Sequence, residues 1–287
     1  MTKLNLKTGI IGAGNMGEAF AGAMIKAEIL SPSMIILSDI NQLRLDFLNK
    51  KYGILTTTDN VKLFLECDVV LLAVKPQQIK DLLEQITLDE KYSAARRKII
   101  ISIAAGIPIC TIENFFYASL DKKAQKNFPV IRVMPNTPSL VLRGMSGMSL
   151  NKNVSKEDCG IAVKILAAMG KVIQFEEKAL DAVTALSGSG PAYVFYLIES
   201  MVKGGVKLGL DPKDAFTLTL STLKGAVALI EELKESPEVL RQKVTSPGGT
   251  TEAAIKVFEE KKVKDSIVEA MTAASTRSKE LVNEDVM

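Results

Sequence analysis

The chain has 287 residues, 47% of them hydrophobic and 24% charged, which suffices to bury a core over about two domains and excludes a disordered or disulfide-stapled chain. Lysine and arginine exceed aspartate and glutamate only by 36 to 33, and tryptophan is absent, so no nucleic-acid partner is expected. There is no histidine and there are only three, widely spaced cysteines, which removes the usual catalytic pairs, gives no basis for a metal site and fits a reducing cytoplasm.

The first half of the chain alternates short apolar runs with amphipathic stretches, which is typical of a parallel sheet with crossover helices. Strands are predicted at residues 8–11, 34–38, 69–73, 98–103 and 130–134, with a last strand at 171–175. Helices are expected between them, including residues 17–27, 42–50 and 76–85. The apolar runs are all shorter than the roughly 18 residues that cross a bilayer, so no membrane segment is expected.

After residue 176 the pattern changes to long amphipathic stretches. Helices are predicted at residues 192–208, 213–233, 237–243, 252–260 and 264–282. The 192–208 segment is apolar on most of its circumference and must be buried, within its own domain or against a second chain. We therefore predict an α/β protein with a Rossmann doubly wound parallel sheet over residues 1–176 and an all-helical dimerisation domain over 177–287, present as a homodimer or an even-numbered assembly of dimers.

A GxGxxG motif begins at Gly12, directly after the first predicted strand and at the start of the first helix. In such a motif the first glycine allows a tight turn, the second lets a pyrophosphate approach the backbone, and the third allows close helix packing. Glycines of a plain tight turn are the alternative. The surrounding strand and helix favour a dinucleotide site at the positive end of the helix, made of Gly12, Ala13, Gly14, Asn15, Met16 and Gly17.

Asp39 ends the second predicted strand, roughly twenty residues after the motif, where a carboxylate accepts both hydroxyls of an adenosine ribose. This position favours NAD over NADP. A solvated aspartate at the end of a strand, or a turn former, is the alternative interpretation.

Three later loops also follow predicted strands, and loops at that edge of a parallel sheet face the cofactor crevice. Lys75 and the backbone around it are predicted to line the crevice, the alternative being an exposed lysine before a first-turn helix proline. The small residues Ala104 and Ala105 permit close approach of the nicotinamide. Asn136 lies between two prolines that hold its segment away from helix, and a turn without chemistry is the alternative.

The helical half contains two polar, glycine-rich motifs, Ser187-Gly-Ser-Gly-Pro191 and Thr245-Ser-Pro-Gly-Gly-Thr-Thr251. Each is predicted to open a helix, the first with Pro191 at the first helical position and the second with Thr250 or Thr251 as N-cap. Glycines and hydroxyls at a helix N-terminus form a pocket for a small anion such as a carboxylate. Helix capping alone explains either motif equally well.

At these residues the chain resembles the pyrroline-5-carboxylate reductase family. The segment Thr245-Ser-Pro-Gly-Gly-Thr-Thr251, followed by Glu252-Ala-Ala-Ile, matches the signature of that family. Four further motifs match in order and at similar spacing: Gly12-Ala-Gly14-Asn-Met-Gly17, Ala73-Val-Lys-Pro76, Pro135-Asn-Thr-Pro138 and Ser187-Gly-Ser-Gly-Pro191. The resemblance covers nearly the whole chain. It implies reduction of the imine of 1-pyrroline-5-carboxylate to L-proline, the final step of proline biosynthesis, with NADPH or NADH as cofactor.

The resemblance also implies roles for single residues. In the family the substrate carboxylate is held by the loop that corresponds to Ser246–Thr251, through the Ser246 hydroxyl and N–H groups near Gly249 and Thr250. Thr251 is implied as the catalytic hydroxyl that hydrogen-bonds the ring nitrogen. Cofactor contacts are implied at Asn60, Ala73, Val74, Lys75 and Pro76. A protonated cyclic imine already accepts hydride well and needs orientation more than a base, so the lack of histidine is compatible with this chemistry.

The chain departs from many family members near Asp39, where they carry a small residue or an Asn-Arg pair suited to a 2′-phosphate. Arg44 is the only arginine close enough in sequence to reach such a phosphate, from one turn into the next helix. We therefore expect NADH to be used at least as well as NADPH.

Two other functions are weighed against this one. A 3-hydroxyacid dehydrogenase shares the layout of the two halves, but its GxxxNxxK motif has no counterpart here, because residues 190–207 contain no asparagine. A protein that senses NAD without turnover is the alternative from another class, and the complete carboxylate loop argues against it.

Overall fold

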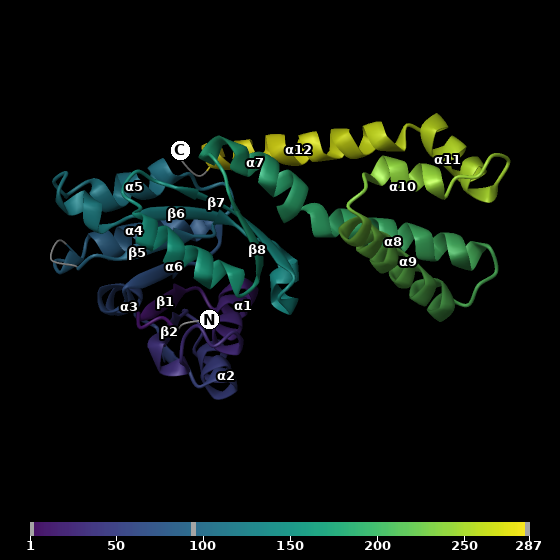
Figure 1. Ribbon diagram of the computed structural model, residues 1–287. Helices are drawn as coiled ribbons and strands as arrows, with labels where there is room; N and C mark the ends of the chain where they lie inside the picture. Colours follow the sequence, from purple (N-terminus) through teal and green to yellow (C-terminus); the bar gives the residue numbers. More distant parts are fainter. Residues whose placement is uncertain (1–2, 93–95, 285–287) are drawn as a thin grey trace. The chain divides into compact units, whose positions relative to one another are not determined.

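The computed structural model describes residues 3–92 and 96–284. The chain forms two compact units: the first, unit 1, runs to Ser189 and resumes at Ala274, and the second, unit 2, comprises Gly190–Ala273. Figure 1 labels the elements along the chain.

Within the described residues, unit 1 contains one eight-stranded sheet in the order β3-β2-β1-β4-β5-β6-β7-β8. The strands are β1 (Thr8–Ile11), β2 (Ile35–Ser38), β3 (Leu55–Thr57), β4 (Val69–Leu72), β5 (Ile99–Ser102), β6 (Val130–Met134), β7 (Gly144–Leu150) and β8 (Gly170–Gln174). Neighbouring strands are parallel except β6 and β7, which are antiparallel. The strand order reverses between β1 and β4, and ligands of such sheets bind at the carboxyl edge beside that reversal.

The six predicted strands are all present, each within one residue of its predicted ends. The predicted sheet lacked two strands, β3 and β7. Several short 3-10 helices among the described residues of unit 1 were not predicted as separate elements. They lie at Pro32–Met34 (η1), Pro76–Gln78 (η2), Ala124–Asn127 (η4), Thr137–Val141 (η5) and Glu177–Ala179 (η6).

Helices cover both faces of the sheet. One face packs against α1 (Asn15–Lys26), α2 (Gln42–Tyr52) and α6 (Lys156–Ala167). The other packs against α3 (Asn60–Glu66), α4 (Ile79–Thr87) and α5 (Ile109–Tyr117). Because side chains alternate along a strand, Ile10 belongs to the first core and Ile11 to the second. Burial on both faces explains why the strands are continuous apolar runs in the sequence.

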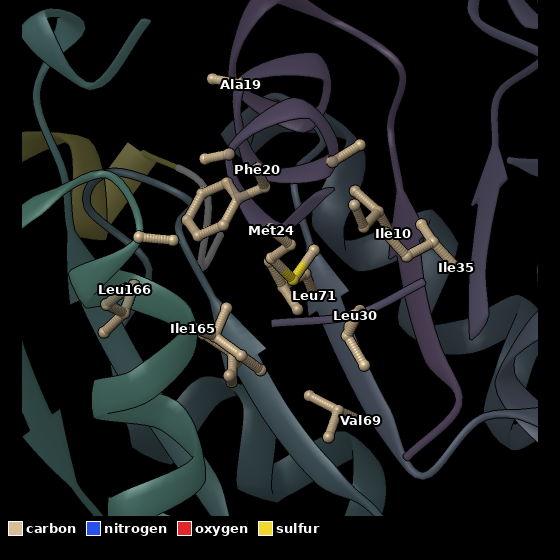
Figure 2. Packing of buried hydrophobic residues seen from close by; sticks show 14 of the residues in the cluster. Ile10, Ala19, Phe20, Met24, Leu30, Ile35, Val69, Leu71, Ile165 and Leu166 are labelled. Carbon is tan, nitrogen blue, oxygen red and sulfur yellow. The ribbon is translucent and has the colours of Figure 1, made fainter. Parts of the chain in front are cut away.

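The first core is centred on α1 and α6. Phe20 and Met24 of α1 are fully buried and pack toward Leu71 of β4, and Ile165 of α6 approaches from the far side of the same cluster (Figure 2). Burying a side chain of this size contributes about 1.5–3 kcal/mol relative to leaving it in water. These contacts fix α1, and with it the glycine-rich loop at its N-terminus, on the sheet.

The second core contains a cluster of aromatic rings next to a buried lysine. The cluster consists of four rings within 6.2 Å of one another, those of Phe64, Tyr92, Phe116 and Phe128. Lys98 is fully buried beside it, with its ammonium 5.1 Å from the centre of the Phe64 ring. The Lys98 Nζ donates hydrogen bonds to the carbonyl oxygens of Leu65 and Cys67, at 3.1 and 3.0 Å, and so caps the end of α3. Burial lowers the pKa of Lys98 to about 8.

The chain leaves the sheet through a short helical segment. This segment consists of α7 (Leu180–Val183) and a π-helical turn η7 (Thr184–Gly188). Leu180 and Val183 pack on β7, where a Cβ on Gly147 would lie 2.7 Å from Val183 Cγ1. The sheet therefore holds residues that the sequence assigned to the helical domain. The predicted boundary between residues 176 and 177 stays a prediction, since a compact unit and an evolutionary domain need not end at the same residue.

Unit 2 is helical, as the sequence predicts. Its helices are α8 (Gly190–Lys207), α9 (Pro212–Leu233), α10 (Pro237–Lys243), α11 (Thr250–Glu260) and the first half of α12 (Val263–Glu284). Within residues 190–273, all of which the structure describes, only Ala215 and Thr219 are buried. In the single chain α8 buries none of its residues, although its apolar sequence predicts that it is buried. No helix of the described residues combines the length and the apolar character that crossing a membrane requires.

Candidate active site

The glycine-rich loop joins β1 to α1, and its three glycines have different surroundings. Gly12 has a positive φ of 107°, and a Cβ there would lie 2.6 Å from the Ala73 carbonyl oxygen. A Cβ on Gly17 would lie 2.0 Å from the Gly12 carbonyl oxygen. A Cβ on Gly14 would meet no atom within 4 Å. The first and third glycines are therefore required by packing, whereas the second borders open space.

The N-terminus of α1 offers unpaired donors beside that space. Gly14 is the N-cap and has no side chain to cap the helix. The first intrahelical bond is made by the Glu18 N–H to the Gly14 carbonyl oxygen at 3.0 Å. The N–H groups of Asn15, Met16 and Gly17 precede this bond, and such groups at the positive end of a helix bind phosphate. The loop thus fits the pyrophosphate of a dinucleotide.

Asp39 lies immediately after β2, beside this loop. Its Oδ2 accepts a hydrogen bond from the Ala13 N–H at 2.7 Å, and its Oδ1 accepts one from the Asn41 N–H at 2.9 Å. The carboxylate therefore connects the glycine-rich loop to the first turn of α2. The hydrogen bond from the Asn41 N–H forms the local turn that is expected if Asp39 is a turn former. A contact between Asp39 and a ribose stays a prediction.

The other predicted cofactor residues lie on the same edge of the sheet. Asn60 begins α3, where its Oδ1 accepts from Ser38 Oγ at 2.8 Å and its Nδ2 donates to Gln85 Oε1 at 3.1 Å. Ala73 and Val74 follow β4 at the point where the strand order reverses, next to Gly12. Lys75 is exposed, and Pro76 begins η2.

Beyond the reversal, Ala104 and Ala105 follow β5, and Ala104 is buried. Asn136 follows β6 and is fixed through its amide: Oδ1 accepts from the Met145 N–H at 2.8 Å, while Nδ2 donates to Ser187 O at 3.2 Å and to Ser187 Oγ at 3.3 Å. The amide thus joins two motifs that lie far apart in sequence. A contact of Asn136 with the cofactor stays a prediction.

The motif that begins at Ser187 contains the start of a helix, as the sequence predicts, but Pro191 is not its first residue. Ser187 and Gly188 end the π-helical turn, and α8 starts at Gly190, so Pro191 occupies the second helical position and not the first. The glycines serve packing, because a Cβ on Gly188 would lie 2.5 Å from Met134 Cε at the end of β6. The Ser189 N–H donates to the Thr184 carbonyl oxygen at 2.8 Å, which closes the π-helical turn directly before α8 begins.

The second motif also opens a helix, but with a different cap. Helix α11 starts at Thr250, and its N-cap is Gly249, so the predicted N-cap at Thr250 or Thr251 is wrong. The Gly249 N–H donates to Ser246 O at 3.0 Å, and the Gly248 N–H donates to Glu252 Oε2 at 2.8 Å. Gly248 has a φ of 70°, which suits glycine in this turn.

This turn brings the predicted substrate residues together within unit 2. Ser246 and Thr250 are exposed and Thr251 is half-buried. The Gly249 N–H is already engaged, whereas the N–H groups of Thr250 and Thr251 lie in the first turn of α11, where such groups have no acceptor within the helix. Glu252 was not singled out from the sequence, although an acidic residue three positions after an N-cap is a familiar capping pattern.

Sequence reasoning also missed Glu18, in the first turn of α1. Its carboxylate forms ion pairs with Arg44 and with Lys51 Nζ, the latter at 2.8 Å. The signal available in the sequence was an acidic residue directly after the glycine-rich motif, in the first turn of the helix. Among the described residues, no group of three or more cysteine, aspartate or glutamate side chains is arranged to hold a metal ion.

Known proteins resemble this chain over nearly its whole length. A family model described as pyrroline-5-carboxylate reductase dimerisation matches residues 177–281, and one described as NADP oxidoreductase, coenzyme F420-dependent, matches residues 7–106. A pyrroline-5-carboxylate reductase of Methanosarcina acetivorans is 40% identical over 277 residues, which are 96% of this chain and 98% of the relative. The enzyme of the same name from Synechocystis is 38% identical over 97% of this chain and 99% of the relative.

This chain belongs to the pyrroline-5-carboxylate reductase family. Solved structures agree: one of a pyrroline-5-carboxylate reductase from Coxiella burnetii has a TM-score of 0.84 at 37% identity and covers 97% of this chain and 99% of its own. A pyrroline carboxylate reductase from Plasmodium falciparum with NADP bound has a TM-score of 0.85 at 31% identity, covering 98% and 100%. The predicted family, the fold class and the NADPH- or NADH-dependent oxidoreductase activity are confirmed.

Proposed function

We propose that this member of the family catalyses the reduction of 1-pyrroline-5-carboxylate to L-proline, the final step of proline biosynthesis, with the residues assigned below. The observation that carries the proposal is the glycine-rich loop, whose second glycine borders open space at the unpaired N-terminus of α1. The bound dinucleotide supplies the hydride. The chain's own groups bind, orient and assist the proton transfer.

The cofactor residues act mainly through the backbone. The N–H groups of Asn15, Met16 and Gly17 hold the pyrophosphate, and Gly12, Ala13 and Gly14 shape the loop around it. Asn60 braces β2 against α4 through its two hydrogen bonds. The remaining contacts are proposed along the loops after β4, β5 and β6, at Ala73, Val74, Lys75, Pro76, Ala104, Ala105 and Asn136.

The loop that opens α11 holds the substrate. The Ser246 hydroxyl and the backbone around Gly249 and Thr250 bind the carboxylate, with the charge favoured by the positive end of α11. The Thr251 hydroxyl hydrogen-bonds the ring nitrogen. Reduction adds a hydride to the imine carbon and leaves a proton on that nitrogen, so the C=N double bond becomes the C–N single bond of proline. An imine that enters protonated requires no histidine base, and orientation is then the main contribution of the protein.

The proposal includes assembly and compartment. Unit 2 buries only two of its residues in the single chain, and the family model that matches it is named for dimerisation, which supports a homodimer or an even-numbered assembly of dimers. Three free cysteines within the described residues, Cys67, Cys110 and Cys159, support a reducing cytoplasm. The partner in the reaction is a small molecule, with neither nucleic acid nor a membrane involved.

The test is the rate of NADH and NADPH oxidation with 1-pyrroline-5-carboxylate as the acceptor. We expect proline to form in equal amounts to the dinucleotide oxidised, with a KM for NADH no higher than that for NADPH. Binding of dinucleotide without turnover would replace this proposal by an NAD-sensing protein.

The cofactor preference has its own variant. Asp39→Ser removes a carboxylate that would face a 2′-phosphate, and should shift the preference toward NADPH by about ten- to thirtyfold. Asp46→Ser, an exposed aspartate on α2, is the matched control and should leave the preference unchanged. A wild type that strongly prefers NADPH, with no gain in Asp39→Ser, would show that Asp39 does not set the preference.

A further inference from the structure

The carboxylate of Glu18 is the centre of a charged cluster beside the glycine-rich loop. Its Oε1 accepts hydrogen bonds from Lys51 Nζ at 2.8 Å and from the Tyr52 hydroxyl at 3.1 Å, and its Oε2 accepts from Arg44 Nη2. The Glu18 side chain is only 19% exposed. This one acidic group therefore engages two cations of α2 at once.

The charge state of Glu18 follows from these contacts. Partial burial of the carboxyl acts to raise its pKa, but hydrogen bonds from Lys51, Arg44 and Tyr52 outweigh burial and lower the pKa below its ordinary value. Glu18 is therefore ionised at neutral pH and neutralises the cations that contact it.

Arg44 is held on three sides. Its Nε donates to the Ala13 carbonyl oxygen at 2.9 Å, its Nη2 pairs with Glu18, and its guanidinium lies 5.5 Å from the centre of the Phe47 ring. The Arg44 side chain is 28% exposed. The Arg44 Nε and Nη2 donors are thus already used by Ala13 of the glycine-rich loop and by Glu18.

This arrangement bears on the end of the dinucleotide that distinguishes NADPH from NADH. In a Rossmann fold the 2′-position of the ribose lies at the end of β2, and a nearby arginine there receives the 2′-phosphate. In this chain the end of β2 carries Asp39, and Arg44 follows it one turn into α2. Arg44, the arginine nearest to Asp39 in the sequence, is thus already bound to Glu18 and to the Ala13 carbonyl oxygen.

We propose that Glu18 is a positioning residue that sets the dinucleotide preference, because it holds the Arg44 guanidinium away from a 2′-phosphate and so favours NADH. The inference rests on the proposed function, since it places the dinucleotide on this loop. Two residues then disfavour NADPH: the Asp39 carboxylate repels the 2′-phosphate, and Glu18 holds Arg44, the cation that would bind this phosphate.

The test is the ratio of the dissociation constants of NADH and NADPH, which differ only in the 2′-phosphate, measured by titration of cofactor fluorescence. In Glu18→Gln the ion pair is lost and Arg44 becomes free to turn toward the phosphate. We expect NADPH to bind about tenfold more tightly relative to NADH than in the wild type, as a charge-assisted arginine–phosphate bond provides.

A double-mutant cycle shows whether the gain in NADPH binding depends on Arg44. The gain should disappear when Glu18→Gln is made in an Arg44→Met background. If the gain persists there, loss of one negative charge explains it, and the role given to Arg44 is wrong. Glu157→Gln, which removes an exposed glutamate from the first turn of α6, is the matched control for net charge and should leave the ratio at its wild-type value.

The outcomes separate this inference from the proposed function. A wild type that reduces 1-pyrroline-5-carboxylate with NADH, and whose ratio is unchanged in a folded Glu18→Gln variant, overturns the inference alone. A wild type that binds neither dinucleotide overturns the proposed function and the inference with it. Thermal unfolding midpoints of all variants establish that each is folded.

Discussion

The sheet of unit 1 and the helices of unit 2 bury their apolar side chains in different ways. In unit 1 the strands β1, β2, β4 and β5 are buried throughout, between helices that belong to the same chain. In unit 2 only Ala215 and Thr219 are buried, and large apolar side chains are exposed on α8 and α9, among them Phe195, Tyr196 and Phe216. Both regions contain many apolar residues, so composition alone does not reveal which of them is complete within one chain.

The difference has a thermodynamic meaning. A core made within one chain stabilises that chain at any protein concentration, whereas apolar surface covered by a partner contributes only as far as the partner is bound. We expect unit 1 to carry the intrinsic stability of the chain and unit 2 to couple stability to assembly. The following predictions test this contrast, in order of decreasing expected effect.

Phe20→Ala should destabilise the protein most. Phe20 is fully buried in the first core, so its truncation removes buried apolar area and leaves a cavity, at a cost of about 3–5 kcal/mol. Denaturant unfolding measures the loss, which should not depend on protein concentration. Phe47→Ala, at a phenylalanine that is 51% exposed in the same unit, is the control and should cost far less. Equal losses in the two variants would mean that the burial contrast within unit 1 is not what stabilises it.

Phe195→Glu should weaken assembly and leave the fold of unit 1 intact. Phe195 is 58% exposed on α8, and a charge on a covered apolar surface typically costs 2 kcal/mol or more, about thirtyfold in the dissociation constant. Sedimentation should show the wild type as a dimer or a larger even-numbered assembly and the variant shifted toward monomer. A wild type that is a stable, active monomer would contradict the proposed role of unit 2.

Lys98 should produce a pH dependence that originates in the core of unit 1. Burial lowers its pKa to about 8, so between about pH 8 and its ordinary value of 10.5 the unfolded chain holds a proton that the folded chain has lost. Stability attributable to Lys98 therefore rises with pH across this window, by about 3 kcal/mol in total, and is constant below it.

The measurement is the difference in unfolding free energy between the wild type and Lys98→Met at several pH values. The difference is needed because burial raises the pKa of Cys67 to about 12, so that thiol contributes the opposite slope in the same range. A difference that does not change between pH 8 and pH 10 would mean that Lys98 is not shielded from water as its burial indicates.

Thr251→Ala should have a smaller effect, confined to the chemistry. Loss of a hydroxyl that hydrogen-bonds the ring nitrogen should lower kcat/KM for 1-pyrroline-5-carboxylate by about ten- to thirtyfold, with the affinity for dinucleotide unchanged. Thr272→Ala is the control, since that hydroxyl is exposed on α12 and bonds only the Val268 carbonyl oxygen, at 2.8 Å. Normal kcat/KM in Thr251→Ala would remove Thr251 from the mechanism.

The sequence predicted most accurately the bounds of the helices and strands whose formation depends on residues close together along the chain. The strands at Thr8–Ile11 and Val130–Met134 and the helix at Pro237–Lys243 have the predicted ends, because each is a short apolar or amphipathic run between residues that stop it. The glycine-rich loop was also evident, since the spacing of its glycines and the strand before it are both visible along the chain. The same holds for the change from sheet to helices in the second half.

The two missed strands show where local pattern fails. Leu55–Thr57 is three residues long at the edge of the sheet, too short for an alternation to be seen. Gly144–Leu150 contains two glycines and two serines, which disfavour a strand by themselves. It becomes one because β6 and β8 pair with it on both sides, and because Gly147 makes room for Val183.

By itself, the sequence determined the family, the succession of a parallel sheet and helices, and the place of the glycine-rich loop, because these depend on residues that are close together along the chain. Only the tertiary structure decided how the individual polar groups are used. In the folded chain Asp39 accepts hydrogen bonds from two backbone N–H groups, Glu18 forms ion pairs with Arg44 and Lys51, and Gly249 is the N-cap of α11. Hydrogen bonds of this kind join atoms that meet only after the chain has folded, and a carboxylate engages whichever donors packing brings within reach.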